Sequence, residues 1–480
     1  MISDGTADRI AAVEARSTAF RKELGLLDLV LIQILYVVGS AWVGAAAKLG
    51  TDHVVFWLLA AGLYYLPQAA VVIFLSRQLP LEGGLYQWAT AALGRFAGFL
   101  VAWNLWAYGV VMLAGFGVVV ANNLAYLAGP AVTFTSSPLY TPIVSGVTIV
   151  AILVVSLLGL GVGKWIQDAG GAGQLLTYAA LILIPFVALW RGQIAAFHPL
   201  RTTVPSVTTF SLNIFGKMAV GAFSGFEYVA ILAGECRSPS RTIGRSVSIA
   251  VPVIATMFIL GTSSVLALVP ESRIDLVSPI PQTLTIGFGG LGIVRLVVPA
   301  LILLLVVRQL GNMTLLLAGT TRLPMVAGWD GLLPAWFARL HPRFRTPINS
   351  ILFVGALTVA LSLVGQAGVN VQESFQLLDN AAGIFYAFTY LGLFAIPLFG
   401  ANRLPVTVPL WLRGAALAGF AVTALYSVLS IFPIIDVPSW QSFTAKIVIV
   451  LLGTNVLGVT IYARTRHSPS DPQRRLEHQS

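Results

Sequence analysis

The segment from Gly221 to Pro239 reads GAFSGFEYVAILAGECRSP. It overlaps an apolar run, 210–233, that is long enough to cross a bilayer. Gly221, Gly225 and the ionisable Glu227 lie well inside this run. Glycine costs a helix interior about 1 kcal/mol relative to alanine, and a charge at bilayer depth costs about 2.5–3.5 kcal/mol. A span that opens its backbone toward a polar ligand uses both features, so the stretch predicts a broken transmembrane helix. The alternative is a glycine-packed helix contact with a protonated, hydrogen-bonded glutamate.

Composition predicts an all-α membrane protein. Of the 480 residues, 57% are hydrophobic and 10% are charged, whereas about a quarter are charged in ordinary soluble domains. Apolar runs of suitable length predict about 12 transmembrane helices, at 24–47, 54–76, 96–121, 141–162, 172–190, 210–233, 247–269, 291–318, 348–364, 375–400, 408–432 and 443–463. We expect a membrane domain at 24–463 between a polar head, 1–23, and a polar tail, 464–480. The head lacks the short apolar core that is typical of a signal peptide.

Lys and Arg lie mostly in one set of the connections, the set that includes both ends of the chain. The positive-inside rule then predicts a multi-pass protein of the cell membrane with both termini in the cytoplasm. This placement explains the formal net charge of +10, and it indicates the lipid bilayer as a partner rather than nucleic acid.

The first span carries an interruption of its own. Its sequence from Val38 to Gly44, VGSAWVG, places two glycines and a serine in mid-span. The first and sixth spans therefore occupy corresponding positions in two five-helix units. Because five is an odd number, the second unit starts on the opposite side of the membrane and is inverted. We expect two five-helix repeats, at about 24–190 and 210–400, and two extra helices at about 408–463. Paired broken helices of this kind indicate a transport site at the membrane midplane.

Three ordered motifs resemble the amino acid–polyamine–organocation permeases, and the resemblance covers nearly the whole chain. The sixth span has FSGFE at 223–227, then Glu235, Pro239, Arg241 and Ile243, which is similar to F-x-G-F-E…E-x-x-x-P-x-R-x-I. Residues 80–94, PLEGGLYQWATAALG, are similar to P-x-x-G-G-x-Y-x-W…L-G. Residues 319–334, GTTRLPMVAGWDGLLP, are similar to G-T-S-R…R-D-G-x-L-P.

The resemblance implies a LeuT-like 5+5 inverted repeat with two extra C-terminal helices. It also implies a secondary active transporter that moves amino acids or related amines across the membrane by alternating access, and no enzyme activity. A second class stays open, namely a membrane sensor or channel-like protein built on a permease scaffold.

In similar permeases, amides at the first break hold the substrate carboxylate, and carbonyls at both breaks hold its amino group. A helix carries about half a positive charge at its N-terminus, which favours the carboxylate, and about half a negative charge at its C-terminus, which favours the amino group. The matching substrate-binding positions here are Ala41, Trp42, Val43, Gly44 and Ala45 in the first span, with Ala222, Phe223 and Ser224 in the sixth. This chain has Val43-Gly44-Ala45 where the family usually has G-S-G or G-T-G, and fewer glycines leave less room for a close backbone approach.

Other polar and aromatic residues within the spans are candidates for lining the site. They are Asn104, Trp106 and Tyr108 in the third span and Asn312 in the eighth. For Asn104 an interhelical hydrogen bond is the favoured alternative. Arg308 shares a helix face with Asn312 because the two are four residues apart.

Several charges within or near the spans have open roles. Arg308 either pairs with Glu227, binds a substrate carboxylate, or extends to the membrane interface. We expect Lys217 to extend to the interface in the same way. Glu227 either changes protonation during the cycle, balances a cationic substrate, or is structural. A cytoplasmic gate is expected from loop residues, with solvated loop charge as the alternative: Glu82, Gly83, Gly84, Glu235, Arg241 and Arg322.

The coupling ion is also open. Some similar permeases hold a lysine on the fifth span that replaces a sodium ion, and the approximate equivalent here is Thr177. We therefore predict no proton coupling through such a lysine, while Na+ coupling through hydroxyls such as that of Thr177, or exchange without an ion, stays open. The sequence contains no His/Cys cluster with metal-ligand spacing and no P-loop, so we expect no cofactor beyond a coupling ion, H+ or Na+. The particular amino acid or amine and the oligomeric state stay open.

Overall fold

The first transmembrane segment is broken at its glycine. In the computed structural model, helix α2 (Leu26–Val37) ends at Val38, whose backbone is extended. Helix α3 (Ser40–Ala47) begins after the extended Gly39 and is tilted by 47° from α2. This confirms the predicted break in the first span. The structure describes residues 25–79, 84–128, 133–158, 160–226, 239–288, 294–329, 334–341, 346–404 and 406–466.

Helices form nearly all of the described chain. After α2 and α3 they are α4 (His53–Ala60), the π-helix η2 (Ala61–Tyr65), α5 (Leu66–Gln78), α6 (Leu85–Leu93), α7 (Arg95–Ala128), α8 (Tyr140–Leu158), α9 (Leu160–Trp190), α10 (Thr209–Gly216), the π-helix η4 (Lys217–Ala222), α12 (Pro239–Leu268), α13 (Pro279–Phe288), α14 (Val294–Trp329), α15 (Ile348–Gln366), α16 (Val371–Phe399), α17 (Leu410–Leu429) and α18 (Trp440–Arg466). Short 3₁₀ turns occur at η1 (Gly50–Asp52), η3 (Thr133–Ser136), η6 (Glu271–Arg273), η7 (Ala335–Ala338) and η8 (Ala401–Arg403). In the described residues, 10 helical segments are long and apolar enough to span a membrane, and the bent α2–α3 pair raises this to 11.

The sixth span is broken as well. Helix α10 begins at a reciprocal cap, in which Thr208 Oγ1 accepts a hydrogen bond of 3.1 Å from the backbone N–H of Ser211. The helix widens into η4 and then gives way to an irregular backbone at Ser224 and Gly225. Gly225 has a φ of +135°, a conformation that side-chain-bearing residues rarely adopt. The second half of the predicted span, from Glu227 on, lies outside the described residues.

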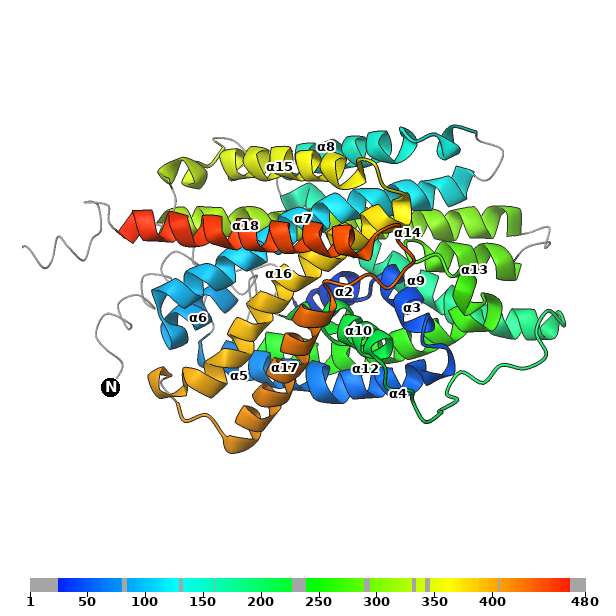
Figure 1. Cartoon of the computed structure of the whole chain (residues 1–480), viewed down its shortest axis with the longest axis horizontal. Coiled ribbons are helices and arrows are strands. Elements are labelled where there is room, and N and C mark those ends of the chain that lie inside the picture. Colours follow the sequence, from blue (N-terminus) through cyan, green and yellow to red (C-terminus); the bar gives the residue numbers. More distant parts are fainter. Residues whose placement is uncertain are drawn as a thin grey trace, which may run out of the picture.

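The broken helices lie in the middle of the bundle (Figure 1). Helix α12 packs against both α2 and α3, α9 packs against α2, and α14 packs against α9 and α7. Figure 1 shows α8 and α15 along one outer edge, and α18 packs against α7 and α16. Their exposed side chains are large and apolar, among them Val147 and Val150 of α8 and Leu452 and Val456 of α18, as expected for surfaces that face lipid.

Candidate functional site

Both helix breaks meet at one cavity. The cavity is lined from five directions, by Tyr36, Val37, Gly39, Ser40, Ala41 and Trp42 at the first break, Gly221 and Ser224 at the sixth-span break, Tyr108, Met112, Phe116 and Val119 of α7, Arg308, Gln309 and Asn312 of α14, and Phe375, Asp379, Gly383 and Tyr386 of α16. Two segments that are far apart in the sequence therefore form a single site, as the paired interruptions predicted.

The backbone at the two breaks offers opposite partial charges to this cavity. The first N–H groups of a helix have no partner within the helix and carry a partial positive charge. In α3 these groups belong to Ser40, Ala41 and Trp42, which line the cavity, and the N-cap Gly39 provides no side-chain cap. At the other break, Gly221 lines the cavity from the last turn of η4, and the carbonyls of a last helical turn carry a partial negative charge. The cavity can therefore hold an anionic and a cationic group at once.

Arg308 is tied to the first break. Its Nη2 donates a hydrogen bond of 2.9 Å to the carbonyl of Val38, and its Nη1 donates one of 2.8 Å to Gln309 Oε1. Gln174 Nε2 of α9 donates a second hydrogen bond, also 2.9 Å, to the same Val38 carbonyl. The side chain of Arg308 is 3% exposed, so the alternative in which it extends to the interface is wrong. The guanidinium instead supplies a fixed positive charge at the carbonyl end of the break.

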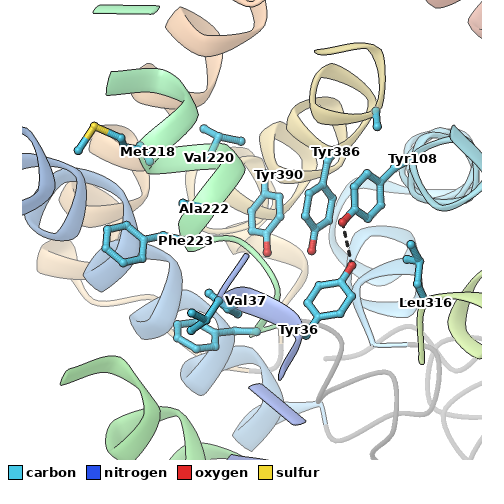
Figure 2. Close-up of a cluster of buried hydrophobic side chains, with 14 of the residues drawn as sticks. Tyr36, Val37, Tyr108, Met218, Val220, Ala222, Phe223, Leu316, Tyr386 and Tyr390 are labelled. Carbon is cyan, nitrogen blue, oxygen red and sulfur yellow. Dashed lines mark hydrogen bonds between the residues drawn. The ribbon is translucent and has the colours of Figure 1, made fainter. Parts of the chain in front are cut away.

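Three tyrosines line the cavity, and a fourth, Tyr390, packs against one of them; we call the four the tyrosine wall: Tyr36, Tyr108, Tyr386 and Tyr390 (Figure 2). The hydroxyls of Tyr36 and Tyr108 are 3.0 Å apart and hydrogen bonded. The Tyr108 and Tyr386 rings are stacked with centroids 3.9 Å apart. Tyr390 Oη accepts a hydrogen bond of 2.9 Å from the backbone N–H of Gly225, so the wall is joined directly to the sixth-span break.

A second charged cluster connects η4 to α16. Lys217 Nζ lies 3.7 Å from Asp379 Oδ2 and also donates a hydrogen bond to Asn380 Oδ1. Lys217 is 1% exposed, so the expectation that it extends to the interface is wrong, because an acidic partner is available inside the bundle. Sequence reasoning did not select Asp379, although an acid inside an apolar span is the same signal that singled out Glu227.

The helical rotation of α3 divides the predicted substrate-binding residues into two groups. Ala41, Trp42 and Ser224 line the cavity. Five others lie away from it, which corrects the expectation that they border the site: Val43, Gly44, Ala45, Ala222 and Phe223. A side chain at Gly44 would meet Pro279 of α13, at 2.9 Å, rather than the cavity. The ring of Phe223 is stacked on that of Tyr65, with centroids 4.2 Å apart.

The candidate lining residues divide in the same way. Tyr108 and Asn312 face the cavity, whereas Asn104 and Trp106 do not. Asn104 Nδ2 donates a hydrogen bond of 2.9 Å to Asn455 Oδ1 of α18, which confirms the interhelical alternative. Trp106 packs against Trp103 on the outer side of α7, with ring centroids 5.2 Å apart.

The remaining predicted residues are not gathered at the cavity. Thr177 is buried and donates a hydrogen bond of 2.8 Å to the carbonyl of Gly173 in its own helix. Gly84 precedes α6 with a φ of +42°, Arg241 is exposed in the first turns of α12, and Arg322 is half-buried near the end of α14. Glu82, Gly83, Glu227 and Glu235 lie outside the described residues, so the roles of these acids stay predictions. Over the described ranges, no group of His, Cys, Asp and Glu residues could hold a metal ion.

A bundle of membrane-spanning helices with two broken members around a buried cavity defines a transporter, and the comparisons agree. The chain superposes on the crystal structure of MhsT in complex with L-phenylalanine with a TM-score of 0.61, at 15% identity, over 85% of this chain and 98% of that one. This neighbour has the LeuT fold, which confirms the predicted fold class. A family model described as "Amino acid permease" matches residues 24–453, so the chain belongs to the amino acid permease family.

Relatives with known names are similar over most of their length. The chain is 23% identical to the human b(0,+)-type amino acid transporter 1, over 90% of this chain and 86% of the relative. It is 22% identical to the serine/threonine exchanger SteT of Bacillus subtilis, over 80% and 85% respectively. It is 24% identical to an uncharacterized transporter of Legionella pneumophila, over 83% and 84%. The protein is thus a multi-pass membrane protein and a secondary amino acid transporter rather than an enzyme.

Proposed function

We propose that this protein carries an α-amino acid in its zwitterionic form, bound between the two helix breaks, across the cell membrane. The observation that carries the proposal is the meeting of both breaks at one cavity with opposite partial charges. The substrate carboxylate binds the N–H groups of Ser40, Ala41 and Trp42, and the ammonium group binds the carbonyl of Gly221 in the last turn of η4. A free amine would leave the N–H groups unsatisfied, which disfavours polyamines as substrates.

The side chain of the substrate points toward the apolar part of the cavity. Met112, Phe116 and Val119 of α7 and Phe375 of α16 line this part. Apolar walls favour an uncharged side chain, because a charge placed there would lose its hydration, and the Asp379 carboxylate that also lines the cavity is already paired with Lys217. The names of the human and Bacillus relatives, an amino acid transporter and a serine/threonine exchanger, agree with an amino acid as the substrate, and the second name agrees with an uncharged side chain.

Transport does not use sodium. The Val38 carbonyl at the first break already accepts hydrogen bonds from Arg308 and Gln174, and the Thr177 hydroxyl donates within its own helix. A sodium ion at this position would meet the positive charge of Arg308, and the guanidinium performs the charge-balancing role of such an ion. The distribution of Lys and Arg supports an orientation with both termini in the cytoplasm.

A binding screen with matched ligands tests the substrate class. We expect purified protein to be stabilised by one or more of the protein amino acids, by about 2.7 kcal/mol at a ligand concentration of 100 Kd. For leucine, the matched ligands are 3-methylbutylamine, which lacks the carboxylate, and 4-methylpentanoate, which lacks the amine. Stabilisation by the amino acid alone supports the two-ended site. Equal stabilisation by either fragment would contradict it, and saturable uptake into proteoliposomes separates a transporter from a channel-like protein or sensor.

A further inference from the structure

The charged cluster of Lys217, Asp379 and Asn380 has no part in the binding mode described above. Lys217 is the first residue of η4, the segment that precedes the sixth-span break, and Asp379 lies in the third turn of α16. The side chains of the ion pair are 2% and 8% exposed. A charge inside a membrane-spanning segment is expensive and most often serves a transport pathway. We therefore expect the cluster to have a function in transport other than binding the amino acid.

The two members of the ion pair have different surroundings. Asp379 lines the cavity, whereas Lys217 does not. Lys217 Nζ has a second acceptor, Asn380 Oδ1, which stays available when the carboxylate is removed. For Asp379, Lys217 is the cation that acts on its charge. If the pair separates, the ammonium keeps a partner while the carboxylate is left facing the cavity alone.

Other titratable groups near the pair do not replace Lys217. Tyr426 of α17 interacts electrostatically with Asp379 and with Tyr108 of α7. Arg308 of α14 shares the cavity but is engaged with Val38 and Gln309. The remaining described charges on elements that pack against α16 lie within two turns of a helix end: Arg77, Arg95, Arg403, Arg413, Lys446 and Arg464. Glu373 lies on α16 itself, in its first turn.

We infer that Asp379 is the proton-binding residue of this transporter and that Lys217 controls it, an inference that rests on the proposed transport function. The pair joins the broken sixth span to α16, so movement of one relative to the other changes their separation. A buried carboxylate keeps its charge only while a cation is near it. When Lys217 withdraws, an O–H bond of a hydronium ion in the cavity breaks and leaves water, and the proton forms an O–H bond with the Asp379 carboxylate.

The return step reverses this transfer. When the pair closes again, the O–H bond breaks, the proton passes to water, and the carboxylate pairs with the ammonium of Lys217. Lys217 keeps its protons throughout, because Asn380 holds the ammonium group while the pair is open. Alternating access exposes the cavity to the two sides in turn, so one proton is carried in each cycle. Arg308 cannot take this role because a guanidinium does not lose its proton in proteins.

Infrared spectroscopy tests the protonation step without any substrate. In Lys217→Met the cation is gone, and we expect the carbonyl band of a protonated carboxyl group at neutral pH in purified protein. The band should be absent from the wild type and from the double variant Lys217→Met/Asp379→Asn. In Lys217→Met/Glu373→Gln, which changes a buried acid of the same helix, the band should persist. If Lys217→Met shows no band that depends on Asp379, the inference is wrong.

Proteoliposomes test the coupling. Two uptake values are measured with a radiolabelled mixture of the protein amino acids: accumulation driven by an inward proton gradient, and counterflow without a gradient. The ratio of accumulation to counterflow reports the coupling. We expect a ratio well above one for the wild type and for Glu373→Gln, and a fall to one for Lys217→Gln/Asp379→Asn. A wild-type ratio of one, or an undiminished ratio in the double variant, would overturn the proton-coupling role. Absence of counterflow in the wild type would instead count against the proposed function, and the infrared result would still decide the protonation of Asp379.

Discussion

Arg308 donates a hydrogen bond of 2.9 Å to the carbonyl of Val38, and this bond joins α14 to the point where the first broken helix begins to unwind. The carbonyls at the end of a helix carry a partial negative charge and lack partners within the helix. Here Arg308 and Gln174 supply those partners together. The break is therefore held open by side chains of the protein.

Replacing Arg308 should abolish most of the transport. Hydrogen bonds to charged groups contribute about 1.5–3 kcal/mol, which corresponds to a loss of about 10- to 100-fold in uptake for Arg308→Met. Arg308→Lys keeps the charge but has a shorter reach, so its loss should be smaller. Uptake into proteoliposomes with sodium or with potassium as the external cation measures both effects, and wild-type uptake should be equal in the two. The control Arg413→Met changes an exposed arginine of α17 and should leave uptake unchanged. Uptake by the wild type that requires sodium would contradict this role of Arg308.

Gly225→Ala should impair both stability and transport. Gly225 has a φ of +135°, and an added Cβ would lie 2.6 Å from Tyr36 Cδ1 and 2.9 Å from Val37 Cγ2. Strained backbone of this kind costs about 1–3 kcal/mol, and the displaced Tyr36 belongs to the tyrosine wall. We expect a lower melting temperature and reduced uptake. Gly453→Ala on α18, where nothing lies within 4 Å, is the matched control and should behave like the wild type. A variant of Gly225 with wild-type uptake would show that the sixth-span break tolerates a side chain.

Gly44→Leu should separate binding from transport. A side chain at Gly44 would meet Pro279 at 2.9 Å and push α13 away from α3, but it would not enter the cavity. We therefore expect uptake to be lost while the thermal stabilisation by an amino acid is retained. Gly414→Leu, at a position on α17 with nothing within 4 Å, should leave both unchanged. Loss of amino acid binding in Gly44→Leu would instead show that Gly44 borders the substrate, as predicted from the sequence.

Tyr108→Phe should loosen the tyrosine wall. It removes the hydroxyl that is hydrogen bonded to Tyr36 but keeps the ring stacked on Tyr386. Such a bond contributes about 0.5–1.5 kcal/mol, so the population in which the wall is open should rise by up to about tenfold. The probe is Ser40→Cys in a Cys236→Ser background, labelled by a membrane-impermeant thiol reagent from either side of the membrane.

Labelling of this probe should become faster from one side of the membrane only. Tyr140→Phe is the matched control, because it removes a hydrogen bond of 3.0 Å, to the carbonyl of Ala121, between two residues that do not line the cavity. It should not change the labelling rate from either side. An equal increase from both sides in Tyr108→Phe would indicate general loosening of the bundle and contradict a specific role of the wall.

Much of the site was predictable from local sequence. The glycines at 39 and 225 interrupt apolar runs, and both positions lie at observed breaks. The placement of Ala41, Trp42 and Ser224 on the cavity followed from the family motif. The same reasoning failed for Gly44 and Phe223, because it treated every residue near a break as facing the substrate. A helix presents only part of each turn to one neighbour, and the remaining residues pack against α13 or among aromatic rings.

Local sequence is enough to predict a bundle of membrane helices with two broken members, because hydrophobic length and helix-breaking glycine act within a single segment. The pairing of the buried charges could not be predicted in this way. Lys217 and Asp379 lie in different helices, and neither shows in its own segment that the other is its partner. Arg308 had several open roles until α14 was packed beside the end of α2. The pairing of buried charges depends on the rotation and packing of whole helices, and these are properties of the complete bundle.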